Sequence, residues 1–322
     1  MTELLRIEGL TVTPQNAPEK KLVNNVSFTL ESGKTTCVVG ESGSGKSLTA
    51  LSVMGLLSSQ LRLAQGKVIF QGQDLVGISN DELRKIRGGR IGMIFQEPMT
   101  SLNPVLTIGK QIGETLIVHQ GLRGQSLKAR IAALLEQVGI PASRANSYPD
   151  ELSGGQRQRV MIAMSIACEP AMLIADEPTT ALDVTIQAQI LKLMKKLKDE
   201  LGTAIMFITH DLGVVYEICS RAVILYCGQI VEEAKVSDLF KNPLHPYTEG
   251  LLNSLPVLGN SGKLNVIPGS VPIANQFPEG CIFNPRCEHA MEKCKSKIPP
   301  TIELKDGHKV KCWLRCEDME VE

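Results

Sequence analysis

Short aliphatic runs alternate along the chain with segments in which apolar residues recur at helical spacing. Glycine and polar residues bound each run, and this alternation is typical of an α/β fold with a mainly parallel sheet. The runs predict buried strands at Thr35–Val39, Ile91–Phe95, Met172–Ala175, Ala204–Ile208 and Ala222–Tyr226.

The spacing of apolar residues also predicts two helices. One begins after Asp183, whose side chain suits an N-cap, and ends at Gly202, a residue type favoured at helix C-termini. Its apolar face is formed by Ile186, Ile190, Leu193, Leu197 and Leu201. The other helix runs from Gln156 to about Cys168 and ends before Pro170.

The character of the sequence changes twice along the chain. No strand pattern occurs between Gln96 and Asp150, which predicts a helical insertion in the α/β core. From Asn242 onward prolines become frequent and both periodicities fade, which indicates a loop-rich appendage. We therefore expect one large domain followed by a smaller C-terminal extension.

The composition excludes several classes of protein. The 322 residues include 34 Lys and Arg and 34 Asp and Glu, so no excess positive charge favours binding to nucleic acid. Hydrophobic residues make up 43% and aromatic residues 4%, which allows an aliphatic core and argues against global disorder. No apolar stretch reaches the roughly 18 residues of a membrane span. The N-terminus lacks the pattern of a signal peptide, so we expect a cytoplasmic protein.

The first chemical motif fits the phosphate-binding pattern G-x-x-x-x-G-K-[ST]. An apolar strand precedes it and a helical run follows, which is the context that this P-loop motif requires. Its glycines let successive backbone N–H groups face phosphate oxygens, Lys46 would reach the β- and γ-phosphates, and Ser47 would bind Mg²⁺. The predicted phosphate site consists of Gly40, Glu41, Ser42, Gly43, Ser44, Gly45, Lys46 and Ser47.

Two further motifs supply groups that a P-loop needs. The strand Met172–Ala175 leads into Asp176 and Glu177, so Asp176 would lie beside Mg²⁺ and Glu177 could accept a proton from an attacking water. The run Leu152-Ser153-Gly154-Gly155-Gln156 opens a helix, where two glycines would let a phosphate approach bare N–H groups. The alternative for this run is a simple N-cap by Ser153, which needs only one such residue.

On these motifs the chain resembles the ATP-binding subunit of ABC transporters over about residues 1–250. The run 152–156 resembles the ABC signature, and Gln96 in FQEP resembles the Q-loop glutamine. The resemblance extends to the D-loop at Ala181-Leu182-Asp183 and to the switch histidine at His210. It implies a RecA-like core, an antiparallel β subdomain and a helical subdomain at about 97–160, followed by an extension over 251–322.

Three segments also resemble the oligopeptide/dipeptide importer branch of this family: 95–104, 175–185 and 242–256. So does the cysteine-rich tail. Of nine cysteines, five lie near the C-terminus: Cys281, Cys287, Cys294, Cys312 and Cys316. Their spacing alone leaves zinc, an iron–sulfur cluster, disulfides and free thiols open.

The resemblance to this branch implies a [4Fe–4S] cluster on Cys281, Cys287, Cys294 and Cys312, with Cys316 as a rival ligand and Zn²⁺ as the alternative metal. We interpret such a metal as structural, because it would hold together a segment too irregular to build its own core. The remaining cysteines lie in apolar surroundings and are expected to be buried bystanders: Cys37, Cys168, Cys219 and Cys227.

The family resemblance also implies a mechanism. Two subunits pair head to tail with two ATP molecules between them, and Ser153–Gln156 of one subunit face the P-loop of the other. Glu177 then acts as the base for water attack on the γ-phosphate, with Lys46, Gln96 and His210 as the other catalytic residues. The implied Mg²⁺ ligands are Ser47, Gln96 and Asp176. Residues 11–25 contain no aromatic side chain to stack on adenine, so the base contact is unassigned.

The function implied is ATP hydrolysis that powers uptake of di- or oligopeptides. The expected partners are two transmembrane permease subunits, a second and different ATP-binding subunit, and a solute-binding protein that acts through the permeases. The chain would lie peripherally on the cytoplasmic face of the membrane. The alternatives are the same role for nickel or another small solute, a soluble ABC ATPase, and a regulatory protein that binds nucleotide without turnover.

Overall fold

The computed structural model describes residues 2–180, 182–255, 267–273 and 276–317. Contacts within the chain divide it into two compact units. The first unit consists of Met1–Leu4, Leu30–Lys34 and Leu75–Ile208, and the second of Leu5–Thr29, Thr35–Asp74 and Thr209–Glu322. The expected domain boundary near residue 250 stays a prediction.

The first unit contains three parallel strands: β6 (Ile91–Ile94), β7 (Met172–Asp176) and β8 (Ala204–Thr209). Every residue of β7 and β8 is buried, as expected for parallel strands whose sequences are continuous apolar runs. Strand β7 pairs with β6 on one side and β8 on the other, so Ala175 lies opposite both Ile94 and Phe207. The predicted strands are confirmed here.

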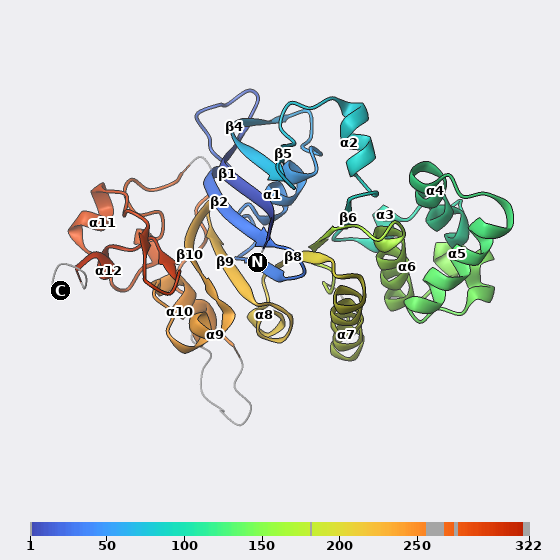
Figure 1. Cartoon of the computed structure of the whole chain (residues 1–322). Helices are drawn as coiled ribbons and strands as arrows, with labels where there is room; N and C mark the ends of the chain where they lie inside the picture. Colours follow the sequence, from blue (N-terminus) through green and yellow to red (C-terminus); the bar gives the residue numbers. More distant parts are fainter. Residues whose placement is uncertain (1, 181, 256–266, 274–275, 318–322) are drawn as a thin grey trace. The chain divides into compact units, whose positions relative to one another are not determined.

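Helices make up most of the rest of the first unit (Figure 1). They are α2 (Asn80–Ile86), α3 (Pro98–Ser101), α4 (Ile108–Gln120), α5 (Gly124–Gln137), α6 (Gly154–Ile166) and α7 (Val184–Leu201), with 3-10 turns at Ala142–Asn146 and Pro149–Glu151. Residues 97–150 form helices and turns but no strand in their described part, as predicted. Helix α7 has the predicted ends, because Asp183 accepts a hydrogen bond from the Ile186 N–H and Gly202 adopts a left-handed conformation.

The second unit contains a four-stranded antiparallel sheet in the order β2-β1-β4-β5. Its strands are β1 (Glu3–Pro14), β2 (Val23–Glu31), β4 (Leu61–Phe70) and β5 (Gln73–Asp74). Strand β2 buries alternate residues, since one face packs against the core and the other meets solvent. The apolar-run criterion missed these strands, whereas the family resemblance implied an antiparallel subdomain.

A second group of strands in the same unit connects the phosphate motif to the C-terminal extension. Strand β3 (Thr35–Val39) is parallel to β9 (Arg221–Tyr226), which is antiparallel to β10 (Gln229–Lys235). The extension continues this sheet with β12 (Lys309–Val310) on β10 and β11 (Ile302–Glu303) on β12.

Short helices complete the second unit. They are α1 (Lys46–Val53), α8 (Leu212–Ile218), α9 (Val236–Lys241), α10 (Pro246–Asn253), α11 (Glu292–Ser296) and α12 (Trp313–Glu317), with a 3-10 turn at Asn284–Arg286. The described part of the extension is therefore loop-rich, with only short regular elements, as its sequence predicted.

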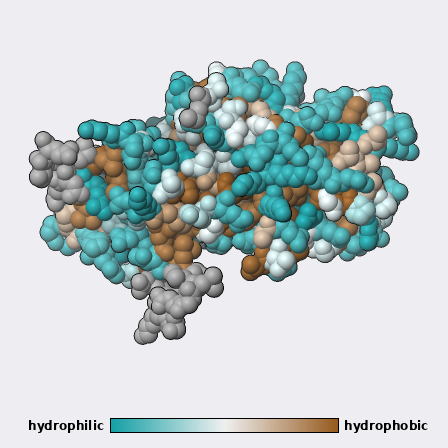
Figure 2. Space-filling model, turned by 60° about the horizontal axis from the view of Figure 1, so that its bottom comes forward, coloured by the Kyte–Doolittle hydropathy of each residue, from teal (hydrophilic) through white to brown (hydrophobic). Residues whose placement is uncertain are grey.

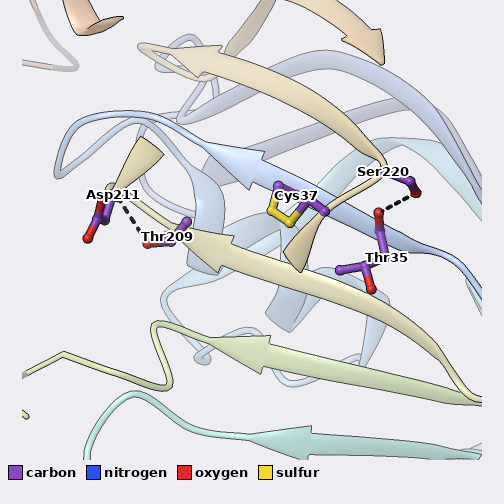
Figure 3. Close-up of a disulfide and its surroundings, with 6 residues drawn as sticks. Thr35, Cys37, Thr209, Asp211 and Ser220 are labelled. Atoms are coloured by element: carbon purple, nitrogen blue, oxygen red, sulfur yellow. Dashed lines mark hydrogen bonds between the residues drawn. A yellow bond between two sulfur atoms is a disulfide. The ribbon is translucent and has the colours of Figure 1, made fainter. Parts of the chain in front are cut away.

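A disulfide joins Cys37 of β3 to Cys219, which follows α8 (Figure 3). The two Cα atoms are 6.0 Å apart. The prediction that Cys37 and Cys219 are buried bystanders did not include this bond. They lie 182 residues apart in sequence, and the fold brings them together where the Ser220 side chain donates to the Thr35 carbonyl at 2.9 Å.

The core is aliphatic and the surface is polar, as the composition suggested. Tyr226, Tyr247, Phe70 and Phe207 are the large aromatic exceptions among fully buried side chains. On the face in Figure 2, hydrophilic residues cover most of the surface and hydrophobic residues form smaller patches between them. In the described part of the chain, no helix combines the length and apolar character needed to cross a membrane.

Candidate functional site: a P-loop, a carboxylate strand end and a cysteine cluster

The P-loop lies in the second unit, between β3 and α1. Gly43 and Gly45 have φ angles of 79° and 98°, a conformation that residues other than glycine rarely adopt. A Cβ atom on Gly40 would collide with the Leu225 carbonyl oxygen, so this position also requires glycine. The loop ends at Gly45, the N-cap of α1, where helix N–H groups are suited to bind phosphate.

Lys46 is buried against the loop that it would serve. Its Nζ donates to the carbonyl oxygens of Gly40 at 2.7 Å and Glu41 at 2.9 Å, and the residue is 5% exposed. These two carbonyls hold the ammonium group against the backbone of the loop.

Glu41 is held from two further directions. Its backbone N–H donates to the Tyr247 hydroxyl at 2.9 Å, and its carboxylate accepts hydrogen bonds from Arg286 at 2.7 and 3.2 Å. Burial raises the pKa of the Tyr247 phenol, so this hydroxyl stays neutral. Sequence reasoning did not find Tyr247 or Arg286, because no local pattern reports a contact between residues 245 apart.

In the first unit, Asp176 and Glu177 lie at the carboxyl end of β7, as predicted. Asp176 is 5% exposed. Glu177 has a φ angle of 46°, an uncommon conformation for a residue with a side chain, and its N–H donates to the Ile208 carbonyl at 3.0 Å. The backbone is thus turned sharply where the second carboxylate leaves the strand.

Two side chains hold the Glu177 carboxylate. Gln96, two residues beyond β6, donates from Nε2 to Glu177 Oε2 at 3.3 Å, and the Thr180 hydroxyl donates to the same oxygen at 2.9 Å. The structure therefore brings two predicted catalytic residues together and adds Thr180, which sequence reasoning did not single out.

Ser153–Gln156 opens α6 with a reciprocal capping box. Ser153 Oγ accepts from the Gln156 N–H at 3.3 Å, and Gln156 Oε1 accepts from the Ser153 N–H at 3.0 Å. A Cβ on Gly155 would lie 2.8 Å from Ile186 Cγ2, so helix packing explains that glycine. A Cβ on Gly154 would meet no described atom within 4 Å, so packing among the described residues does not explain Gly154.

The last two predicted motifs are placed only in part. His210 directly follows β8 and is exposed. Ala181 lies outside the described residues, while Asp183 caps α7. Their roles as switch histidine and D-loop therefore stay predictions.

Comparison with known proteins shows the family. Residues 23–180 match the ABC transporter family, and residues 231–294 match the C-terminal region of oligopeptide/dipeptide transporters. The oligopeptide transport ATP-binding protein AppD of Bacillus subtilis is 53% identical over 302 residues, which cover 92% of both chains. The oligopeptide transport ATP-binding protein OppD of Haemophilus influenzae is 47% identical over 98% of this chain and 99% of its own.

The chain belongs to the ATP-binding subunits of ABC transporters, in the oligopeptide/dipeptide branch. A solved structure agrees: the ATP-binding cassette MJ0796, described as a dimer in a post-hydrolysis state bound to ADP and Pi, has a TM-score of 0.65 and 31% identity. It covers 72% of this chain and 99% of its own. The fold is thus the P-loop ABC fold, and members of this family are ATPases.

The C-terminal extension of this ABC subunit brings its cysteines together. Cys281, Cys287, Cys294 and Cys312 line one pocket, and Cys316 donates instead to the Cys312 carbonyl at 3.5 Å. Burial raises the pKa of the Cys281 and Cys287 thiols, and raises that of Cys312 to about 11. In the described residues, no group of three or more His, Cys, Asp or Glu is arranged to hold a metal ion, so the predicted metal site is not confirmed.

Proposed function

We propose that this chain is the ATP-hydrolysing subunit that powers uptake of di- or oligopeptides through a membrane permease. The observation that carries the proposal is the 53% identity to an oligopeptide transport ATP-binding protein over 92% of both chains. The match of residues 231–294 to the oligopeptide/dipeptide C-terminal region supports the same substrate class.

In ATP binding, residues 40–47 surround the phosphates, and Lys46 reaches the β- and γ-phosphates. Ser47, Gln96 and Asp176 would hold Mg²⁺, which would supply positive charge to neutralise the phosphates. The glycines at 43 and 45 and the N-terminus of α1 support this assignment, because together they present N–H groups to an anion.

For hydrolysis, Glu177 orients a water molecule toward the γ-phosphate and accepts its proton, while Lys46, Gln96 and His210 act as the other catalytic residues. The contacts from Gln96 and Thr180 to the Glu177 carboxylate support this role, because a base must be held in one orientation to act.

The proposal includes a dimer with ATP between the subunits, in which Ser153–Gln156 contact the nucleotide of the other subunit. Gly154, whose open surroundings leave room for a phosphate, supports this arrangement. MJ0796, a cassette described as dimeric and bound to ADP and Pi, supports it as well. The further partners are two permease subunits, a different ATP-binding chain in the second position and a solute-binding protein, and the complex lies at the cytoplasmic face of the membrane.

We further propose that the extension holds a [4Fe–4S] cluster on Cys281, Cys287, Cys294 and Cys312. The common pocket that these four side chains line supports this, as does the donor set, since thiolates are the usual ligands of such clusters. Zn²⁺ is the alternative. Such a group would be structural and would hold together the short elements of the extension.

Uptake in cells tests the function directly. Cells that lack this chain should lose uptake of a labelled tripeptide, and the wild-type chain should restore it, whereas the Glu177→Gln variant should not. The matched control is Glu97→Gln, which changes an exposed acid next to Gln96. Restored uptake of nickel but not of peptide would favour the small-solute alternative, and unchanged uptake of both would contradict the transport role.

A further inference from the structure

The C-terminal extension contacts the P-loop through one buried arginine. Arg286 closes the 3-10 turn Asn284–Arg286, and its guanidinium binds both oxygens of the Glu41 carboxylate, at 2.7 and 3.2 Å. The Arg286 side chain is 4% exposed and that of Glu41 is 29% exposed. Both residues lie in the second unit, so this is a contact within one compact part of the protein.

Arg286 is itself fixed by the extension and by β9. Its Nε donates to the Pro268 carbonyl at 2.9 Å, its Nη1 lies 3.5 Å from the Tyr226 hydroxyl, and its guanidinium carbon lies 5.8 Å from the centre of the Tyr226 ring. The turn is held by Asn284, whose amide donates to the carbonyls of Glu279 and Cys281. The guanidinium therefore meets Glu41 from a fixed position.

Glu41 connects the fixed Arg286 guanidinium to the rest of the P-loop. Its carbonyl accepts a hydrogen bond from Lys46, the residue that would reach the phosphates, and its N–H donates to Tyr247. The Tyr247 ring packs against Phe283 of the extension, with ring centres 5.4 Å apart. Arg286 of the extension thus contacts Glu41 directly, and Phe283 of the extension contacts Tyr247, which binds the Glu41 N–H.

We propose that Arg286 is a positioning residue for the P-loop, by which the cysteine-rich extension sets the affinity of this subunit for nucleotide. A carboxylate in a phosphate-binding loop repels a polyanionic ligand unless its charge is paired. A bidentate arginine neutralises it and also fixes its direction. The inference rests on the proposed role of residues 40–47 in binding ATP, and it holds whichever metal the cysteines bind.

Calorimetric titration of the full-length chain with Mg-ADP tests the inference, since ADP is not hydrolysed during the measurement. Arg286→Gln should raise the Kd about tenfold, within the usual range of coupling between sites. Arg286→Lys should fall between wild type and Arg286→Gln, because lysine keeps the charge but loses the bidentate geometry. In a Glu41→Gln background, Arg286→Gln should change the Kd less than about twofold, because its partner is no longer charged.

Arg221→Gln is the matched control. Arg221 also ties β9 to the extension, through the Gly307 carbonyl at 3.0 Å, and pairs with Glu233 at 2.7 Å, away from the P-loop. It should leave the Kd for Mg-ADP within about twofold of wild type. A rise as large as that of Arg286→Gln would mean that loosening the extension anywhere weakens binding, and would overturn the inference.

The remaining outcomes separate the inference from the proposed function. An unchanged Kd in Arg286→Gln, or an equal rise with and without Glu41→Gln, would overturn the inference while leaving ATP binding intact. Failure of the wild-type chain to bind Mg-ADP would instead overturn the proposed function. If Arg286→Gln does not fold, Arg286→Lys serves in its place: it should raise the Kd for Mg-ADP severalfold, and an unchanged Kd would overturn the inference.

Discussion

The Gln96 amide donates to the Glu177 carboxylate at 3.3 Å, although the two residues lie 81 positions apart in the sequence. The parallel pairing of β6 with β7 produces this contact, because it brings the carboxyl ends of both strands to the same edge. A glutamine that the family resemblance places among the catalytic residues and Mg²⁺ ligands therefore contacts the expected base directly.

Glu177→Gln should lower kcat for ATP at least about 100-fold while nucleotide binding persists, because an amide cannot accept the proton of the attacking water. Phosphate release and nucleotide binding, each measured on the purified chain, would check this. Glu97→Gln, which alters a neighbouring exposed acid, should keep wild-type turnover. Normal turnover in Glu177→Gln would show that another group is the base.

Thr180→Val should lower kcat about tenfold with little change in KM, because it removes the hydroxyl that donates to Glu177 Oε2 at 2.9 Å and keeps the side-chain volume. Thr180→Ser retains the hydroxyl and should recover most of the activity. Steady-state kinetics of the two variants would measure these changes in kcat and KM. A loss of activity in Thr180→Ser with wild-type kcat in Thr180→Val would mean that the methyl group, not the hydrogen bond, matters.

The sequence was a good guide to the parallel strands because each is a continuous apolar run that is buried on both faces. Strands β1, β2 and β4 were missed because polar residues interrupt their apolar ones; in β2 buried and exposed residues alternate from Val23 to Glu31. The candidate site shows the same difference between local patterns and contacts made by the fold. Contiguous motifs such as 40–47 were recognisable, whereas the contacts of Glu41 with Arg286 and of Cys37 with Cys219 depend on the fold and leave no local pattern.

Glu232 should be a major source of stability in the second unit. The residue is fully buried, and its carboxylate accepts hydrogen bonds from the backbone N–H groups of Leu244 and His245 at 2.7 and 2.9 Å and contacts His308 Nε2 at 2.7 Å. Glu232→Ala leaves these groups buried without a partner, so we expect a loss of about 3 kcal/mol in the free energy of unfolding.

Urea denaturation followed by circular dichroism would measure the effect of Glu232→Ala. Glu303→Ala, which changes an exposed acid on the nearby strand β11, is the control and should alter stability by less than about 0.5 kcal/mol. If the two variants unfold at the same urea concentration, Glu232 does not anchor the extension to β10.

The Cys37–Cys219 disulfide can be counted chemically. Alkylation of the denatured, metal-free chain without reductant should modify seven cysteines, and all nine should react after reduction. Peptide mapping should recover Cys37 and Cys219 in one cross-linked fragment. Nine modified cysteines before reduction would show that the two sulfurs are thiols in the purified protein.

The colour and metal content of the purified protein should distinguish an iron–sulfur cluster from zinc in the cysteine pocket. Protein purified without oxygen should be brown and carry about four irons per chain if the four thiolates hold a [4Fe–4S] cluster, and colourless with about one zinc if they hold Zn²⁺. Cys294→Ser should remove the metal, because Cys294 lines the pocket, whereas Cys316→Ser should retain it. Metal loss in Cys316→Ser with retention in Cys294→Ser would reverse the assignment.

Acidity should also control retention of that metal. Burial raises the pKa of the Cys281 and Cys287 thiols, so they bind protons tightly unless a cation displaces them. Proton release on binding means that affinity for the metal falls as pH falls. Metal content measured after dialysis across a pH series should therefore decrease toward acid, and to a greater extent in the presence of a chelator. A content that does not vary with pH would argue against thiolate ligands at this pocket.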